Sequence, residues 1–270
     1  MNDRLVKLIA TDLDGTLFGP DHEVSDVTAE ALRAVAALGV EVVVATGRSH
    51  WSAVPRLEHL GCVRWLIGSN GATVYDFEAG DVVIRRPLGA DAVRAVVEGV
   101  GKQFPSVGYA WESPDGVFHS DRFVRNRKAT DRRFPIVERP TYEFNIDGPE
   151  ILKLMIAHDL LTEYDWLDAM AVHVPDGLSA STSGASFVEI TAANANKGAA
   201  LRLLCEQLGV DRAETIAFGD HSNDLAMLHW VGTGYAMANG AARLLDIADA
   251  VAPPNHEHGV AQVLTSLFLE

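Results

Sequence analysis

The stretch Leu5–Thr16, LVKLIATDLDGT, places a short apolar run directly before two aspartates. Three later stretches repeat this plan, in which a run rich in Val, Ile or Leu ends in a small or acidic cluster. They read VEVVVATGR at Val40–Arg48, WLIGSNGA at Trp65–Ala72 and TIAFGDHSND at Thr215–Asp224. Apolar runs of this length without polar alternation are typical of strands that are buried on both faces of a parallel sheet.

Helical patterns lie between several of these runs. From Ser25 to Gly39 apolar residues recur at helical spacing, with Ser25 suited to cap the start and Gly39 to end the helix. The stretch Lys197–Gly209 has the same character. Strands that alternate with helices predict a doubly wound α/β sheet, whose ligands bind outside the carboxyl ends of the strands. All four polar clusters fall at such ends, so we expect them to meet in one crevice.

The middle of the chain has a different pattern, with shorter strands and hairpins. We expect a strand in ILKLMIA at 151–157, and a second in AVHVPDG at 171–177 that the loop LSASTSGA joins to SFVEIT at 186–191. These patterns predict an α+β domain of residues 82–191, inserted into a core domain formed by residues 1–81 and 192–270.

Composition and charge narrow the possible partners. The chain has 270 residues, and its 22 Lys and Arg against 37 Asp and Glu give a formal charge of -15. Such a charge disfavours unaided binding to nucleic acid or anionic lipid. The N-terminus lacks the apolar region of a signal peptide, no stretch has the length of a membrane span, and the two cysteines match no metal-ligand spacing. We expect a cytoplasmic monomer or small homo-oligomer without nucleic-acid or membrane partners.

The first cluster holds two carboxylates two residues apart, Asp12 and Asp14. If the strand continued through them, both side chains would point to the same face. Paired carboxylates in different environments can act as nucleophile and proton donor. The alternative is a calcium loop or a turn of capping aspartates, but such a calcium loop needs glycine at its sixth position, where Leu17 stands.

Groups suited to phosphate follow the second and third runs. Thr46 and Gly47 offer a hydroxyl and a backbone N–H, and Ser69 and Asn70 have a similar character. Lys197 opens a predicted helix, whose N-terminus itself attracts anions. Ordinary turns and an exposed surface lysine are the alternative interpretations.

The fourth cluster, Gly219–Asp224, places two carboxylates and an amide at a strand end. Oxygen donors of this kind suit Mg²⁺, whose coordination is usually completed by water and by substrate phosphate. A carboxylate that attacks a phosphate dianion meets strong repulsion, and a divalent cation with a neighbouring lysine would offset it. Capping of the next helix by Ser222 or Asn223 is the alternative.

With these residues in view, the sequence resembles the haloacid dehalogenase superfamily, and most closely its Cof-type hydrolase branch. The resemblance is carried by DLDGTL at 12–17, ATGR at 45–48, Lys197-Gly198 and GDHSND at 219–224, in the family's order, and by Asn239, Asn255 and Gly259 in the tail. It implies a Rossmann-like doubly wound parallel-sheet core with an inserted α+β cap that sets substrate specificity.

The resemblance also implies roles for individual residues. Asp12 would attack phosphorus and become phosphorylated, while Asp14 would protonate the leaving oxygen and then activate water. Thr46 and Lys197 would hold the phosphoryl oxygens, and the substrate side would include the residues Gly47, Arg48, Asn70 and Asn223. Mg²⁺ would be bound by Asp12, the Asp14 carbonyl and Asp220, with Asn223 or Asp224 in support.

The function predicted from the sequence is therefore a magnesium-dependent phosphatase for a small phosphorylated metabolite. Sugar phosphates, nucleotides, pyridoxal phosphate and flavin-related phosphates all stay open as substrates. A phosphomutase, which would return phosphate to a sugar, and a non-catalytic protein that binds phosphorylated metabolites are the alternatives. A dehalogenase is disfavoured because Asp14 would have no role in it.

A basic run stands out in the inserted domain of this acidic chain. Its members are Arg122, Arg125, Arg127, Lys128, Arg132 and Arg133. A solvated face balanced by neighbouring aspartates is the favoured interpretation. The other two interpretations are that the run binds an anionic substrate and that it contacts nucleic acid.

Overall fold

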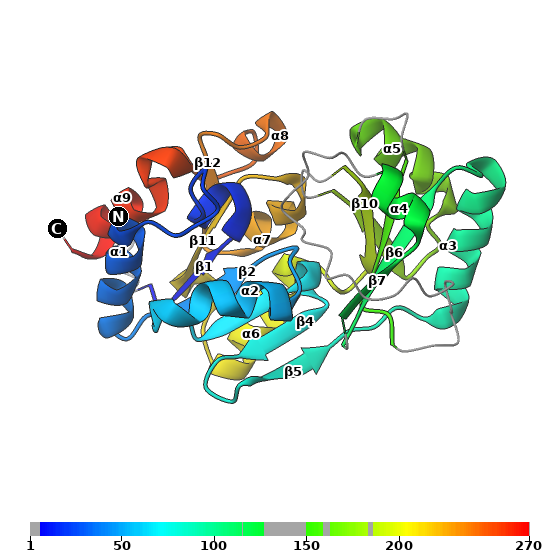
Figure 1. Ribbon diagram of the computed structural model, residues 1–270. Coiled ribbons are helices and arrows are strands. Elements are labelled where there is room, and N and C mark those ends of the chain that lie inside the picture. The colour runs from blue at the N-terminus through cyan, green and yellow to red at the C-terminus, as the bar shows by residue number, and fades with distance from the viewer. Residues whose placement is uncertain (1–5, 115, 127–149, 159–162, 183–185, 270) are drawn as a thin grey trace. The chain divides into compact units, whose positions relative to one another are not determined.

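The computed structural model describes residues 6–114, 116–126, 150–158, 163–182 and 186–269 (Figure 1). The chain divides into two compact units, one of Met1–Ile84 with Asn196–Glu270 and one of Arg85–Ala195. These limits lie a few residues beyond the domain boundaries expected from the sequence. Within the described ranges, no helix combines the length and the apolar character needed to cross a bilayer.

The first unit is built on an eight-stranded sheet in the order β13-β12-β11-β1-β2-β3-β4-β5. The strands are β1 (Leu8–Thr11), β2 (Glu41–Ala45), β3 (Trp65–Gly68), β4 (Thr73–Asp76), β5 (Asp81–Arg85), β11 (Thr215–Gly219), β12 (Thr233–Met237) and β13 (Ala250–Ala252). From β13 to β3 every neighbouring pair is parallel, and β4 returns antiparallel to β3. The chain runs outward from β1 in one direction and from β11 in the other, so the strand order reverses between these two. The doubly wound fold is confirmed, and ligands bind such folds at this reversal.

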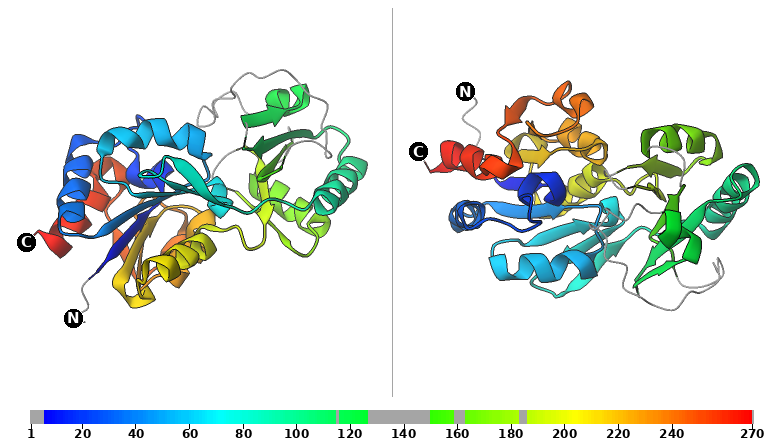
Figure 2. Two further views of the ribbon diagram at one scale, coloured as in Figure 1. Left: turned by 90° about the horizontal axis from the view of Figure 1, so that it is seen from below. Right: turned by 45° about the horizontal axis from the view of Figure 1, so that its top comes forward.

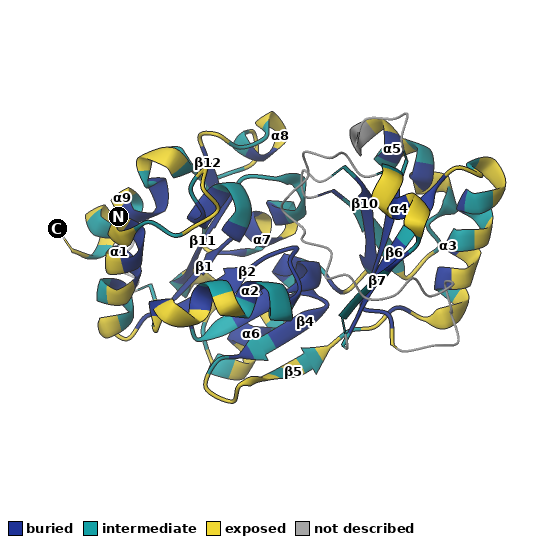
Figure 3. Cartoon of the chain, viewed as in Figure 1, coloured by how far each residue is buried: buried dark blue, intermediate teal, exposed yellow. Residues whose placement is uncertain are grey.

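Helices cover both faces of this sheet, as Figures 1 and 2 show. One face carries α1 (Asp26–Ala37), α2 (His50–Leu57) and α9 (Gly259–Phe268), and the other carries α6 (Lys197–Leu208), α7 (Leu225–Trp230) and α8 (Ala242–Leu245). Successive residues of β1 alternate between them, because Ile9 packs under the first group while Leu8 and Ala10 pack under the second. Figure 3 shows the resulting buried strands. This two-sided burial explains the unbroken apolar runs.

The two helices predicted from the sequence begin and end as expected. The Ser25 hydroxyl accepts a hydrogen bond from the Thr28 amide at 3.3 Å, which caps α1, and Gly39 lies just past its end with φ of +85°. Asn196 caps α6 through the Ala199 amide at 2.8 Å, and Gly209 ends it with φ of +66°. The cap thus lies one residue before Lys197, the first residue of α6.

The second unit is an α+β domain with a five-stranded antiparallel sheet in the order β7-β6-β8-β10-β9. The strands are β6 (Gly108–Ser113), β7 (Gly116–His119), β8 (Lys153–Ala157), β9 (Leu178–Ser181) and β10 (Val188–Ala192). Its helices α3 (Ala90–Gln103) and α5 (Glu163–Met170) share a core with one face, and α4 (Asp121–Asn126) packs through Phe123 on the other.

One expectation for this unit was wrong. AVHVPDG forms no strand, since Ala171–His173 is a helical turn that follows α5, and Val172 is 81% exposed. The strand lies instead in the stretch expected to be a loop, at Leu178–Ser181, where it pairs with β10 at the sheet edge. Pairing with a neighbouring strand outweighs the loop-like composition of Ser and Ala at such an edge.

Candidate active site

The four polar clusters stand at the carboxyl ends of four parallel strands of the first unit. Asp12 follows β1, Thr46 follows β2, Ser69 follows β3 and Asp220 follows β11. Because β1 and β11 are neighbours on either side of the strand-order reversal, Asp12 and Asp220 lie together there. The convergence expected from the sequence is thus present in the fold.

The segment Asp12–Phe18, here called the nucleophile loop after the role predicted for Asp12, leaves the strand at once. Asp14 (φ -81°, ψ 114°) and Gly15 (φ 87°, ψ -6°) have the dihedral angles of a type II turn, so Asp12 and Asp14 do not share a strand face. A Cβ atom on Gly15 would lie 2.3 Å from Asp220 Oδ2. Glycine is therefore required both by the left-handed backbone and by the close approach of Asp220. Thr16, which sequence reasoning did not single out, donates to Asp220 Oδ1 at 3.1 Å.

Lys197 forms the centre of the charged cluster. Its side chain is fully buried and donates to Asp12 Oδ1 and, at 2.6 Å, to Asp224 Oδ1. Burial alone would lower the pKa of the ammonium group, but Asp12 and Asp224 together raise it. Lys197 is thus a fixed cation beside the proposed nucleophile, and the surface-lysine alternative is excluded.

Asp12, Asp220 and Asp224 can place one oxygen each within 4.8 Å of one another. Burial, opposed by Lys197, raises the pKa of Asp12 well above its usual value. Burial and then Asp224 raise the pKa of Asp220 to about 6. The three carboxylates also carry more negative charge than Lys197 neutralises, so burial first and this excess second account for the raised pKa values. Carboxylate oxygens with such an excess are the donor set that a hard divalent cation prefers.

Asp224 differs from the other two carboxylates in its partners. Its Oδ2 accepts the backbone N–H groups of Asp220 and His221, at 3.1 and 3.0 Å, and its Oδ1 accepts from Lys197. Both oxygens are therefore engaged by the protein. Asp224 orders the loop that carries Asp220, and Asp220 and Asp12 are the better candidates for direct metal ligands.

Asp14 is held by Arg48. The guanidinium donates Nε to Asp14 Oδ2 at 2.7 Å and Nη2 to Oδ1 at 2.5 Å, and it is only 3% exposed. Arg48 also lies over the Phe18 ring at 5.7 Å. Sequence reasoning placed Arg48 on the substrate side, and the ATGR motif gave no sign of this pairing with the first cluster. His22, at 3.7 Å from Asp14, was also missed.

The remaining predicted residues join the second, third and fourth clusters. Thr46 is buried, its hydroxyl accepts the Arg48 amide at 3.1 Å, and Gly47 lies between these two residues. The Asn70 amide donates to the Thr46 carbonyl at 3.0 Å, and Asn223 Nδ2 donates to Asn70 Oδ1 at 3.0 Å. Asn70 has φ of +57°, a left-handed conformation that is uncommon outside glycine and concentrates at functional sites.

The basic run of the second unit is described only in part. Arg122 donates to the Pro105 carbonyl, and Arg125 is exposed on α4. The members from Arg127 to Arg133 lie outside the described residues.

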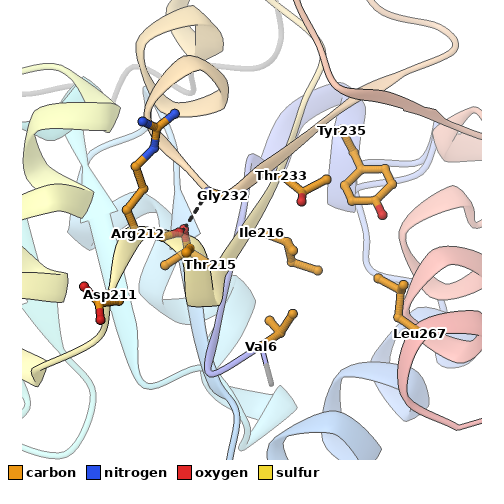
Figure 4. A pocket seen from close by; sticks show the side chains of 10 residues that line it. Val6, Asp211, Arg212, Thr215, Ile216, Gly232, Thr233, Tyr235 and Leu267 are labelled. Atoms are coloured by element: carbon orange, nitrogen blue, oxygen red, sulfur yellow. Dashed lines mark hydrogen bonds between the residues drawn. The ribbon is translucent and has the colours of Figure 1, made fainter. Parts of the chain in front are cut away.

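A pocket of about 600 Å³ opens on the first unit at the other ends of the strands (Figure 4). It is lined by Val6 before β1, by the first residues of β11 and by Thr233 and Tyr235 of β12, with Leu267 of α9. Amino ends of the strands form it, whereas the charged cluster lies at their carboxyl ends. The pocket is therefore separate from the candidate active site.

Known proteins resemble this chain along nearly its whole length. A sequence profile of the haloacid dehalogenase-like hydrolases matches residues 9–264. The phosphatase YwpJ of Bacillus subtilis is 32% identical over 97% of this chain and 100% of its own length. The 5-amino-6-(5-phospho-D-ribitylamino)uracil phosphatase YcsE of the same organism is 29% identical over 96% of this chain and 94% of its own. A solved haloacid dehalogenase-like hydrolase from B. subtilis superposes with a TM-score of 0.82 at 29% identity, covering 97% of this chain and 100% of its own.

The pKa of Asp220, raised by burial and then by Asp224, leads to a prediction for the metal-free protein. Because the pKa of Asp220 is raised from 3.8 to about 6, its ionised form destabilises the fold above that pH, and the penalty vanishes below 3.8. Asp220→Asn should therefore raise the free energy of unfolding by roughly 1–2 kcal/mol at about pH 8 in EDTA, and by little at about pH 4. Urea denaturation measures both values.

The exposed Asp246→Asn is the matched control, because it removes the same charge from a side chain outside the cluster of Asp12, Asp220 and Asp224. Added Mg²⁺ should stabilise the wild type and have much less effect on Asp220→Asn, because ligand binding to the folded state raises stability. A metal-free Asp220→Asn less stable than the wild type at about pH 8 would contradict the prediction.

Proposed function

Because the chain belongs to the haloacid dehalogenase-like hydrolases, we propose that it removes phosphate from a small metabolite through a phosphorylated Asp12 and with bound Mg²⁺. It is a phosphatase by its family and by its full-length relatives. The observation that carries the proposed mechanism is the buried Lys197 that bonds both Asp12 and Asp224 beside Asp220. Here a carboxylate can attack an anionic ester with its negative charge already offset.

In the first step, an Asp12 oxygen forms a bond to phosphorus while the bond from phosphorus to the ester oxygen breaks. Asp14 in its protonated form gives its proton to that leaving oxygen, which leaves the carboxylate that Arg48 pairs with. In the second step, Asp14 takes a proton from water, the water oxygen bonds to phosphorus, and the bond from Asp12 to phosphorus breaks. Inorganic phosphate leaves and Asp12 is restored.

The donor set fits Mg²⁺. Asp12, Asp220 and the Asp14 carbonyl would hold the ion, with Asn223 and Asp224 in support. Once bound, it would offset negative charge on the phosphate oxygens. The Thr46 hydroxyl, the Gly47 N–H and the Lys197 ammonium are proposed to orient those oxygens, and Asn70 and Asn223 to border them. The second unit is proposed to select the leaving group as a cap.

The test is a panel of sugar phosphates, nucleotides, pyridoxal phosphate and flavin-precursor phosphates, assayed for inorganic phosphate with and without Mg²⁺. Rapid quenching and mass spectrometry should find one phosphoryl group on the peptide that contains Asp12. Phosphate release that persists in EDTA would contradict the metal requirement. A mutase would transfer phosphate between sugar positions without releasing it.

Arg48 gives a second prediction for this mechanism. Arg48→Ala removes both hydrogen bonds to Asp14. Because Asp14 is the proposed acid and base and would lose its orientation, kcat should fall by about 10- to 100-fold. Arg48→Lys keeps the positive charge but cannot make the bidentate pair, so its kcat should lie between those of Arg48→Ala and the wild type. Steady-state kinetics on the best substrate measures the effect.

Arg33→Ala is the control, because Arg33 donates to the Leu60 carbonyl at 2.9 Å and not to the nucleophile loop. A rise in KM with unchanged kcat in Arg48→Ala would assign Arg48 to substrate binding instead.

A further inference from the structure

Two asparagines from the end of the chain hold the nucleophile loop by its backbone carbonyls. Asn239 Nδ2 donates to the Gly15 carbonyl at 2.8 Å, and Asn255 Nδ2 donates to the Phe18 carbonyl at 2.8 Å. The two are also linked to each other, since the Asn255 backbone N–H donates to Asn239 Oδ1 at 2.8 Å. We call this pair the asparagine brace. It connects residues more than two hundred positions apart in the sequence.

The brace also reaches the loop that carries Asp220. Asn239 is followed by Gly240 and Ala241, and the Ala241 amide donates to the Asp220 carbonyl at 2.8 Å. A Cβ atom on Gly240 would lie 2.9 Å from that same carbonyl oxygen, so the two segments are in close contact. One short turn thus contacts both the loop of Asp12 and Asp14 and the loop of Asp220.

The segment that presents Asn255 is itself tightly fixed. A Cβ atom on Gly259 would lie 1.8 Å from the Pro253 carbonyl oxygen, so the chain doubles back closely there. His258 has φ of +60°, and its Nδ1 lies 2.9 Å from the hydroxyl of Ser25, the residue that caps α1. Asn255 therefore donates to Phe18 from a closely packed segment.

The nucleophile loop is irregular, because the dihedral angles of Asp14 and Gly15 interrupt its helical backbone. The Leu17 amide donates to the Asp12 carbonyl at 3.3 Å, and the Phe18 amide donates to the Leu13 carbonyl at 2.7 Å. Gly15 sits at the turn and allows many backbone conformations. Small displacements of a reacting group can cost large factors in rate. Hydrogen bonds from an exposed side chain compete with water, so Asn239 adds little to overall stability while it fixes local geometry.

We propose that Asn239 and Asn255 are positioning residues, which hold the nucleophile loop so that Asp12 and Asp14 keep their places against Lys197 and Asp220. The catalytic consequence rests on the proposed phosphatase mechanism. The structural consequence, an ordered loop in the free protein, does not.

Two isosteric variants isolate the two contacts. Asn239→Asp keeps the oxygen that accepts from the Asn255 amide but loses the donor to Gly15. Asn255→Asp loses the donor to Phe18 and keeps its backbone N–H. Gln262→Glu is the matched control, because Gln262 Nε2 donates to the Glu257 carbonyl at 2.7 Å, in the same part of the chain but not to the nucleophile loop. Asn239→Ala removes the donor without adding a charge, so it separates the effect of the lost donor from that of the added charge.

Hydrogen exchange at the Leu17 and Phe18 amides of the free protein is the first readout, and kcat with KM is the second. We expect exchange to become about tenfold faster in Asn239→Asp, Asn239→Ala and Asn255→Asp, with kcat lower by about 10- to 100-fold and KM nearly unchanged. Gln262→Glu should match the wild type in both. Exchange and kcat that stay at the level of Gln262→Glu in all three variants would overturn the proposal. If the three variants exchange faster but the wild type releases no phosphate, the brace is supported and the proposed function is rejected.

Discussion

Asp12→Asn should reduce phosphate release by about 10⁴-fold or more, with the protein still folded. A neutral amide cannot attack phosphorus as a carboxylate does. Of the neighbouring carboxylates, Asp14 is held by Arg48, Asp224 has both oxygens bonded, and Asp220 is proposed to bind the metal. Lys197 keeps its partner Asp224 in this variant, so the loss of stability should be small. Single-turnover assays with the best substrate measure the rate, and thermal unfolding in EDTA measures the stability.

Asp246→Asn is the control for the loss of one carboxylate, because Asp246 is exposed. Rapid quenching should recover no phosphorylated peptide from Asp12→Asn and the normal amount from Asp246→Asn. Residual activity of Asp12→Asn within about tenfold of the wild type would show that another group attacks phosphorus.

The fold of the first unit could be predicted because local signals and burial agree. Strands buried on both faces leave unbroken apolar runs, and four such runs mark β1, β2, β3 and β11. Ser25 and Gly39 mark the ends of α1 through caps that need no distant partner. The carboxyl ends of parallel strands meet at one edge, so the convergence of Asp12 and Asp220 follows from topology alone.

Partner choice within the site could not be predicted from the same signals. Arg48 follows β2 and could equally have reached a ligand, and only the path of the nucleophile loop brings Asp14 to it. Likewise Asp220 and Asp224 are equivalent carboxylates in the sequence GDHSND. The turn of the chain aims two backbone N–H groups at Asp224 and leaves Asp220 facing Gly15.

Long-range pairing explains the other failures. The strand at Leu178–Ser181 has a loop-like sequence and exists through its pairing with β10. The family resemblance singled out Asn239 and Asn255 but not their partners, because both donate to backbone carbonyls, which carry no sequence signal.

Lys197→Met should have the largest effect on stability, lowering the free energy of unfolding in EDTA by about 3–5 kcal/mol. The substitution keeps much of the side-chain volume but leaves Asp12 and Asp224 buried without their cation. Lys7→Met is the control, because Lys7 bonds Glu214 at 2.8 Å with a side chain that is 49% exposed, and such pairs contribute at most about 1 kcal/mol. Urea denaturation of both variants measures the difference.

The cause of that loss can be separated from simple repacking by a second substitution. If uncompensated negative charge destabilises Lys197→Met, then adding Asp224→Asn to it should recover at least about 1 kcal/mol of the free energy of unfolding. Asp224→Asn alone should instead destabilise the wild type, because it weakens the hydrogen bond to Lys197. Added Mg²⁺ should also recover part of the loss, because a cation held by Asp12 and Asp220 offsets the same charge. A Lys197→Met variant as stable as Lys7→Met, or one that Asp224→Asn destabilises further, would show that Lys197 does not balance these carboxylates.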